Sequence, residues 1–167
     1  GEALERLNKT RETIGKATSD VRRAINKLMD DSPAKKDLWT RLHDSADEIA
    51  SQHDLKLVWL ADADSAPEPS PQTAEQVYNI TREALVNAAR HANAKQISVQ
   101  MGQRDETYFV TIEDDGKGFD TSQPAPSGHF GLQIMQARAK HVGGNIEVRS
   151  TPGQGTRVTL TWTSERV

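Results

Sequence analysis

The chain has 167 residues, which is the size of one domain, and it carries 21 Lys and Arg against 24 Asp and Glu, a formal net charge of −3. This balance lacks the basic excess that binding to nucleic acid or anionic lipid requires. No cysteine is present, so disulfides, thiolate metal sites and a cysteine nucleophile are excluded. No apolar run approaches the roughly 20 residues that cross a bilayer, and we expect a soluble cytoplasmic chain without direct membrane contact.

Residues 1–30 carry an apolar heptad pattern that predicts a long helix with one narrow hydrophobic stripe. Its members are Leu4, Leu7, Ile14, Val21, Ile25 and Leu28. Arg11 and Thr18 occupy the two remaining heptad positions, so the stripe is imperfect. Because a stripe of this kind needs partner helices to cover it, we expect a helical hairpin or bundle, within one chain or between subunits, rather than a helix on a sheet.

A second helix is predicted after the break at Asp31, with Ser32 as N-cap and Pro33 at the first helical position. Apolar residues recur at helical spacing to about Gln52, namely Leu38, Leu42, Ala46, Ile49 and Ala50. The next segment, "LKLVWL", predicts a short strand. The segment "ADADSAPEPSPQ" is rich in Pro, Asp and Ser and predicts a loop.

The remainder of the chain predicts two more helices and four strands. One helix starts at Thr73, with Gln76 in capping-box position, and its apolar stripe is Val77, Ile80, Ala84, Leu85 and Ala88. "QISVQM" and "YFVTIE" predict a hairpin that turns near Arg104 and Asp105. After a glycine-rich loop a further helix turns four side chains inward, Leu132, Met135, Ala139 and Val142. "NIEVRS" and "TRVTLTW" predict the last strands. This order predicts a two-layer α/β (α+β) sandwich, with helices on one face of a mixed, mostly antiparallel sheet.

Polar residues follow one stripe of the helix "YNITREALVNAARHANA". Glu83, Asn87, Arg90 and His91 are spaced by one turn or less. A carboxylate and an amide one turn apart suit Mg²⁺, which takes few protein oxygens and keeps several waters. A solvated helix face would have the same composition.

Three glycine-containing segments follow in the chain. In "EDDGKGFD", Asp114 stands where an apolar strand ends, and Gly116 and Gly118 allow a sharp turn and a close approach of ligand to backbone. In "GHFGLQIM", Gly128 and Gly131 precede a helix, whose free N–H groups favour phosphate. "GQGTRV" precedes the last strand. Each segment alone is also typical of an ordinary turn.

Taken in order, E-x-x-x-N, D-x-G-x-G, G-x-x-G-L and G-x-G-T resemble the ATP-binding module of sensor histidine kinases. That module has the Bergerat fold and belongs to the GHKL superfamily, shared with DNA gyrase B, the ATP-dependent heat-shock chaperones and the MutL proteins. "REALVNAARHA" and "GHFGLQIMQARA" resemble the nitrate/nitrite-sensor group in particular. The resemblance covers residues 73–162, and residues 1–60 resemble, by pattern only, the second helix of the dimerisation hairpin and its link to the module.

The resemblance implies a role for each matching residue. Asn87 would bind Mg²⁺, and Glu83 would arrange a metal-bound water or assist proton movement. Asp114 would accept a hydrogen bond from the adenine amine. The remaining nucleotide-binding residues would be Arg90, His91, Gly116, Gly118, Gly128, Gly131, Leu132, Gly155 and Thr156. Asp115 replaces the Asn that often follows the adenine-binding Asp, and only Phe119 and Phe130 are available for a lid.

The function implied is transfer of the γ-phosphoryl group of Mg-ATP to a histidine, with relay to the receiver domain of a response regulator. Residues 1–30 would be part of the dimerisation and phosphoacceptor hairpin, and residues 31–167 the catalytic domain. The parent protein would be a homodimer and an inner-membrane sensor with this part in the cytoplasm. The alternatives are an anti-sigma-factor-type serine kinase, a non-catalytic nucleotide-binding or dimerisation module and, less favoured, a gyrase-like or chaperone-like ATPase.

His43, in "RLHD", imitates the phosphoacceptor motif of this group. However, the heptad helix precedes it, Pro33 intervenes, and about 40 positions separate it from Glu83. We therefore expect His43 to lie on the surface of a connecting helix, and the acceptor histidine to be absent from this chain. No other histidine has a matching context.

Overall fold

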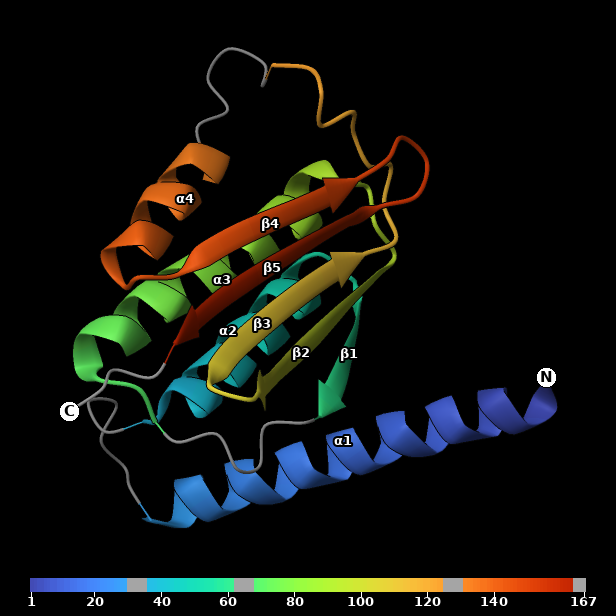
Figure 1. Cartoon of the computed structure of the whole chain (residues 1–167). Coiled ribbons are helices and arrows are strands. Elements are labelled where there is room, and N and C mark those ends of the chain that lie inside the picture. Colours follow the sequence, from blue (N-terminus) through green and yellow to red (C-terminus); the bar gives the residue numbers. More distant parts are fainter. Residues whose placement is uncertain (30–35, 62–67, 125–130, 164–167) are drawn as a thin grey trace.

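A computed structural model describes residues 1–29, 36–61, 68–124 and 131–163 of the chain (Figure 1). Helices and strands follow one another in the predicted order. The helices are α1 (Glu2–Met29), α2 (Leu38–Gln52), α3 (Pro71–His91) and α4 (Gly131–His141). The strands are β1 (Lys56–Ala61), β2 (Gln96–Arg104), β3 (Thr107–Asp114), β4 (Asn145–Ser150) and β5 (Thr156–Thr163).

The strands form one sheet in the order β1-β2-β3-β5-β4. β1 runs parallel to β2, and every other neighbouring pair is antiparallel. Helices α2, α3 and α4 lie on one face of this sheet, and α1 lies beside its β1 edge (Figure 1). The predicted two-layer sandwich with a mixed, mostly antiparallel sheet is therefore confirmed.

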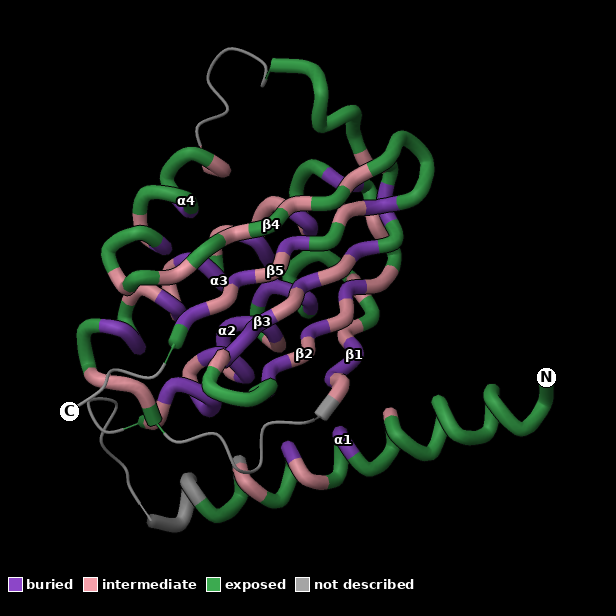
Figure 2. Tube along the Cα trace, in the orientation of Figure 1, coloured by how far each residue is buried: buried purple, intermediate pink, exposed green. Residues whose placement is uncertain are grey.

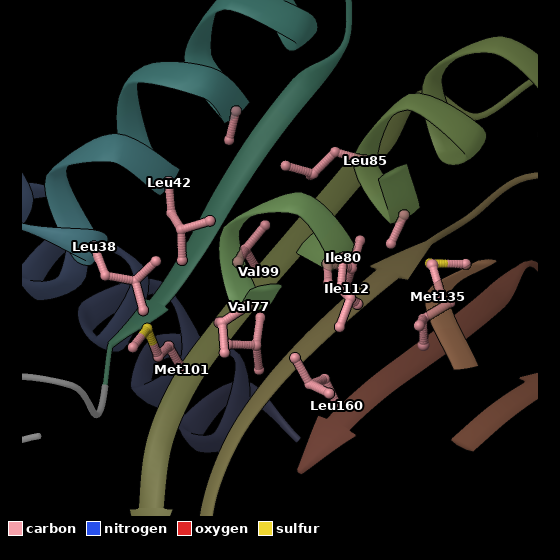
Figure 3. Close-up of a cluster of buried hydrophobic side chains, with 14 of the residues drawn as sticks. Leu38, Leu42, Val77, Ile80, Leu85, Val99, Met101, Ile112, Met135 and Leu160 are labelled. Carbon is pink, nitrogen blue, oxygen red and sulfur yellow. The ribbon is translucent and has the colours of Figure 1, made fainter. Parts of the chain in front are cut away.

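The hydrophobic core lies between the sheet and the helices that cover it. Register brings Val99 opposite Ile112 and Ile112 opposite Val158 on the helix-facing side. The stripe predicted for α3 is buried against them, with Val77 and Ile80 almost inaccessible (Figure 3). Burial of one such side chain stabilises the fold by roughly 1.5–3 kcal/mol. Purple and pink alternate along the central strands in Figure 2, as expected for a sheet with one covered face.

Two helix starts differ from the prediction. α2 begins at Leu38 because Asp37 is its N-cap, and the Asp37 carboxylate accepts a hydrogen bond from the Thr40 N–H at 2.8 Å. The predicted start at Ser32 and Pro33 lies outside the described residues. α3 begins at Pro71, because Ser70 is the N-cap and Pro71 fits the first helical position. The predicted cap at Thr73 is wrong, and the Ser70 hydroxyl accepts the Thr73 N–H instead.

Helix α1 contacts the rest of the molecule through a face that the heptad pattern did not indicate. Gly15 and Ser19 are buried, and Glu12, one turn earlier, lies 3.7 Å from Lys56 at the start of β1. Five side chains of the heptad stripe keep 49–67 % of their surface exposed, namely Leu4, Leu7, Ile14, Val21 and Ile25. The sequence favoured a hairpin or bundle over a helix on a sheet, yet α1 also contacts the sheet, because its small and polar face packs against the edge strand. The hairpin or bundle stays a prediction. The apolar stripe remains available to a partner helix.

His43 is buried, with 3 % of its surface exposed, so its predicted place on the helix surface is wrong. Its ring stacks on Trp59 with centroids 3.5 Å apart. Its Nδ1 lies 2.9 Å from the Ser19 hydroxyl of α1. The predicted apolar stripe of α2 faces the sheet and α3, but α1 and β1 also cover the neighbouring side of α2, which carries His43. Periodicity within α2 could not reveal that this side is covered.

Replacement of the buried imidazole tests this packing. We expect His43→Ala to lower the free energy of unfolding by about 2–4 kcal/mol, because it opens a cavity and removes the ring stacked on Trp59. Urea denaturation of the whole chain measures the change. His53→Ala is the matched control, since His53 is exposed, and a surface substitution changes stability by less than about 0.5 kcal/mol. Equal, small effects of both substitutions would contradict the buried position of His43.

Candidate nucleotide-binding site

Asp114 is a buried carboxylate at the end of β3. It is 6 % exposed, and its Oδ1 accepts a hydrogen bond from the Gly116 N–H at 2.9 Å. Burial raises the pKa of Asp114, although hydrogen bonds from the backbone of Gly116 and Thr156 oppose the shift. A carboxylate held in this way at a strand end has acceptor capacity left for a ligand N–H group. This environment is compatible with the hydrogen bond from an adenine amine that the sequence predicted for Asp114.

The predicted glycines crowd around this strand end. A Cβ at Gly116 would lie 2.2 Å from the Ala92 carbonyl oxygen, and one at Gly155 would lie 2.0 Å from the Asp114 carbonyl oxygen. Gly118 and Gly155 also have positive φ angles, +60° and +77°. Thr156 pairs directly with Asp114 across β3 and β5. The structure therefore brings Asp114, Gly116, Gly155 and Thr156 together, as predicted, and explains why side chains are excluded there.

The connection between α3 and β2 is held against the same strand end. The Asp115 carboxylate accepts hydrogen bonds from the Lys95 and Gln96 N–H groups, at 2.8 and 3.0 Å. These bonds, that from Gln96 above all, lower the pKa of Asp115. The Lys117 N–H donates to the Ala92 carbonyl at 2.6 Å. Asp115 thus has a defined structural role, whereas the sequence indicated only an additional negative charge.

Ser150, which no motif indicated, joins two of the glycine segments. Its Oγ accepts a hydrogen bond from the Phe119 N–H at 2.9 Å and donates one to the Gly155 carbonyl at 3.0 Å. The same hydroxyl lies 2.8 Å from the Thr156 hydroxyl. A serine at a strand end before "TPG" is an ordinary turn residue in sequence, so only the tertiary structure identifies this link.

Glu83 and Asn87 lie on α3 where the N-terminus of α4 approaches. Both side chains are half-buried. A Cβ at Gly131 would lie 2.6 Å from the Glu83 Oε1 and 3.3 Å from the Asn87 Nδ2. The structure therefore brings together the E-x-x-x-N pair and the second glycine of G-x-x-G-L, which are 44 and more residues apart in sequence. The absent side chain of Gly131 is what leaves room over the carboxylate.

The donor set on α3 fits a Mg²⁺ ion that is shared with phosphates. Glu83 offers carboxylate oxygens and Asn87 an amide oxygen, and hard cations prefer such ligands. In the described segments, no three His, Cys, Asp or Glu side chains gather as a metal site of protein ligands alone would require. Mg²⁺ usually has few protein ligands and completes its shell with water and substrate phosphate, so this pair is compatible with it.

The remaining predicted residues lie around this region. Arg90 and His91 are exposed in the last turn of α3, and Leu132 is half-buried in the first turn of α4. Gly128 and Phe130 lie outside the described residues. Phe119 is exposed and begins the segment that leads toward them. The loop after β3, the β4–β5 turn and the C-terminal end of α3 meet at one end of the sheet (Figure 1).

Two glycines of the β4–β5 turn provide a matched pair of substitutions. Gly153 and Gly155 both have positive φ, about +80°, but only Gly155 lacks space for a Cβ. We expect Gly153→Ala to cost about 1–2 kcal/mol of stability from strain alone. Gly155→Ala should cost clearly more and weaken ATP binding, because it displaces Asp114. Thermal unfolding and calorimetric titration with ATP measure both effects, and equal losses from the two substitutions would contradict the crowding.

Comparison with known proteins agrees with these features. Residues 72–166 match the family described as histidine kinase-, DNA gyrase B- and HSP90-like ATPase. An uncharacterised sensor-like histidine kinase of Chloroflexus aurantiacus is 40 % identical over 89 residues, which cover 50 % of this chain and 15 % of that protein. Sensor histidine kinase YdfH of Bacillus subtilis is 36 % identical over 92 residues, 54 % of this chain and 23 % of that protein. Sensor protein VraS of Staphylococcus aureus is 32 % identical over 84 residues, which cover 50 % of this chain and 24 % of that protein. The matched region thus spans a quarter or less of these relatives.

Solved structures share the fold. The histidine kinase domain of a blue-light activated histidine kinase from Erythrobacter litoralis has a TM-score of 0.64 at 23 % identity, covering 83 % of this chain and 67 % of that one. The histidine kinase AdeS of Acinetobacter baumannii has a TM-score of 0.60 at 16 % identity, covering 77 % of this chain and 64 % of that one. Within the described part of this chain, no helix has the length and apolar character needed to cross a bilayer. The chain belongs to the family of histidine kinase-, DNA gyrase B- and HSP90-like ATPases, and residues 72–166 form its ATP-binding domain.

Proposed function

We propose that this chain is the ATP-binding catalytic part of a two-component sensor histidine kinase, which transfers the γ-phosphoryl group of ATP to a histidine outside this chain. The named relatives are sensor kinases. The observation that carries the proposal is the buried Asp114 carboxylate, held by the Gly116 N–H at 2.9 Å. In this reading Asp114 accepts the adenine amine, and Gly155 and Thr156 form the wall beside it.

Asn87 and Glu83 would serve the phosphate end of the same nucleotide. Bound there, Mg²⁺ would neutralise charge on the phosphates. Asn87 would contribute its amide oxygen as a ligand, and Glu83 would orient a water or accept the proton released by the histidine. In the transfer, the bond between the γ-phosphorus and its bridging oxygen breaks, a bond to an imidazole nitrogen forms, and ADP leaves. Positioning supplies most of the rate in such transfers, and Arg90, His91 and the N–H groups near Gly131 would contribute it.

One property of α1 supports a kinase of the histidine type over a serine kinase. Its apolar stripe is exposed on the face that points away from the ATP-binding domain, so it is free to pack on a second helix. We propose that residues 1–30 belong to a dimerisation hairpin, with residues 31–167 as the catalytic domain. The parent protein would then be a homodimeric inner-membrane sensor with this part in the cytoplasm, and would pass its phosphoryl group to a response regulator. The nitrate/nitrite-sensor subtype stays a prediction.

His43 is unsuitable as the acceptor on steric grounds. The ring lies between α1 and Trp59 with 3 % of its surface exposed, and an attacking nitrogen must reach the γ-phosphorus in line. We therefore expect the isolated chain to bind ATP without labelling itself. Incubation with γ-labelled ATP, followed by acid and alkali stability tests, checks this. Acid-labile label that disappears in His43→Gln would contradict the assignment.

Asp114→Asn should separate recognition from stability. The amide oxygen can still accept the Gly116 N–H, but the NH₂ group cannot accept a hydrogen bond from adenine. A lost hydrogen bond to a charged group is worth about 1.5–3 kcal/mol, so ATP affinity should fall about tenfold or more. Calorimetric titration with Mg-ATP measures the loss. Asn87→Ala is the comparison, because it should remove the dependence of ATP affinity on Mg²⁺ instead. Unchanged affinity of Asp114→Asn would contradict the proposed site.

The stability of Asp114→Asn should not fall with its ATP affinity. The pKa of Asp114 is raised by burial, so its ionised form opposes folding. Its favourable contribution is complete below the unfolded pKa of about 3.9 and is lost as pH rises through the raised pKa of the folded protein. At pH 7 the unfolding free energy of Asp114→Asn should therefore equal or exceed that of the wild type. Chemical denaturation between pH 4 and 8 tests this, and a clear loss of stability at pH 7 would show that the carboxylate is a structural anchor.

A further inference from the structure

Asp115 is exposed, yet its carboxylate has a fixed position. One oxygen, Oδ1, accepts both the Lys95 N–H at 2.8 Å and the Gln96 N–H at 3.0 Å. The Asp115 N–H in turn donates to the Gln96 carbonyl at 3.3 Å. Main chain and side chain of one residue therefore bind the start of β2. An exposed carboxylate that accepts two consecutive N–H groups acts as a backbone clamp.

The clamped segment is the connection from α3 to β2, residues 92–96. Asn93 within it has φ +51°, in the left-handed region that Asn adopts more readily than most residues with a side chain. On the other side of the segment, the Lys117 N–H donates to the Ala92 carbonyl, and Gly116 leaves no space for a Cβ against Ala92. The bend at residues 92–96 is thus held from both sides by hydrogen bonds to residues 115–117.

This connection relates the two halves of the proposed site. Asp114 lies at the end of β3, immediately before the clamp, and Asn87 lies five residues before Ala92 on α3. At 1.5 Å per residue, the helix sets about 7.5 Å along its axis between Asn87 and Ala92. The position of α3 along this axis relative to Asp114 therefore depends on how firmly residues 92–96 are held to residues 115–117.

We propose that Asp115 is a positioning residue for nucleotide binding: its carboxylate holds the end of α3 to the end of β3 and so sets the distance between the adenine-binding Asp114 and the phosphate-binding Asn87. This inference rests on the proposed function. Asp115 does not itself contact the nucleotide. Its action requires an acceptor oxygen at this point but does not require a negative charge. An Asn in the same place would therefore hold the same two N–H groups.

Calorimetric titration of the whole chain with Mg-ATP, at a temperature where each variant is folded by circular dichroism, tests the proposal. Asp115→Ala should weaken ATP about tenfold, and Asp115→Asn should restore most of that loss. Asp37→Ala is the matched control, because Asp37 likewise accepts a backbone N–H, that of Thr40 at 2.8 Å, at the start of α2. It should lower the melting temperature and leave ATP affinity as in the wild type. Wild-type affinity in Asp115→Ala, or an Asn variant as weak as the Ala variant, would overturn the proposal.

Asp115→Asn gives a second readout, which remains available if Asp115→Ala does not fold. Because its amide oxygen can still accept the Lys95 and Gln96 N–H groups, its ATP affinity should stay close to that of the wild type, and a clear loss would count against the geometry. Failure of this inference is distinguishable from failure of the proposed function. If the wild type binds no ATP, the function is wrong; if Asp114→Asn loses ATP and Asp115→Ala retains it, only the role of Asp115 is wrong.

Discussion

The packing of α3 on the middle of the sheet is the contact on which the other features depend. Val77, Ile80 and Leu85 are almost inaccessible, and α3, which carries them, packs on β3 and β5. A helix fixed along this stripe has no freedom to rotate about its axis, since rotation would expose these side chains at about 25 cal/mol for each Å². The adjacent stripe, with Glu83 and Asn87, is thereby directed toward the N-terminus of α4. Hydrophobic burial of one face thus orients the polar residues of the next.

Close packing at the end of β3 is the second requirement. Gly116 and Gly155 lie where any Cβ would collide with a carbonyl oxygen, and neighbouring N–H and hydroxyl groups bind the segments together around Asp114. The carboxylate is buried at a cost, because burial opposes its ionised form. A neutral acceptor would fill a purely structural position without this cost, so the buried acid supports the proposed recognition of a ligand donor.

Helix α1 shows how one amphipathic helix can serve two neighbours. Its small and polar positions, Gly15 and Ser19, lie against β1 and α2, while Leu7 and Ile14 remain exposed. Small residues allow the close approach, and the Ser19 hydroxyl meets the imidazole of His43 at 2.9 Å. The ATP-binding domain therefore rests on α1 without covering the stripe that a partner helix would use. Both contacts can exist at the same time.

Local patterns in the sequence determined the order of elements, the two-layer class and the buried stripe of α3, because hydrophobic periodicity acts over a few residues. The set of motif residues around Asp114 followed from the resemblance of the ordered motifs to the ATP-binding module of histidine kinases. The predicted cap of α3, Thr73, was wrong because the competing cap, Ser70, differs from it only in context. The burial of His43 and the roles of Asp115 and Ser150 were decided by tertiary structure alone. Each depends on residues of another element, such as Ser19 beside His43 and Phe119 beside Ser150, and no periodicity within one element carries that information.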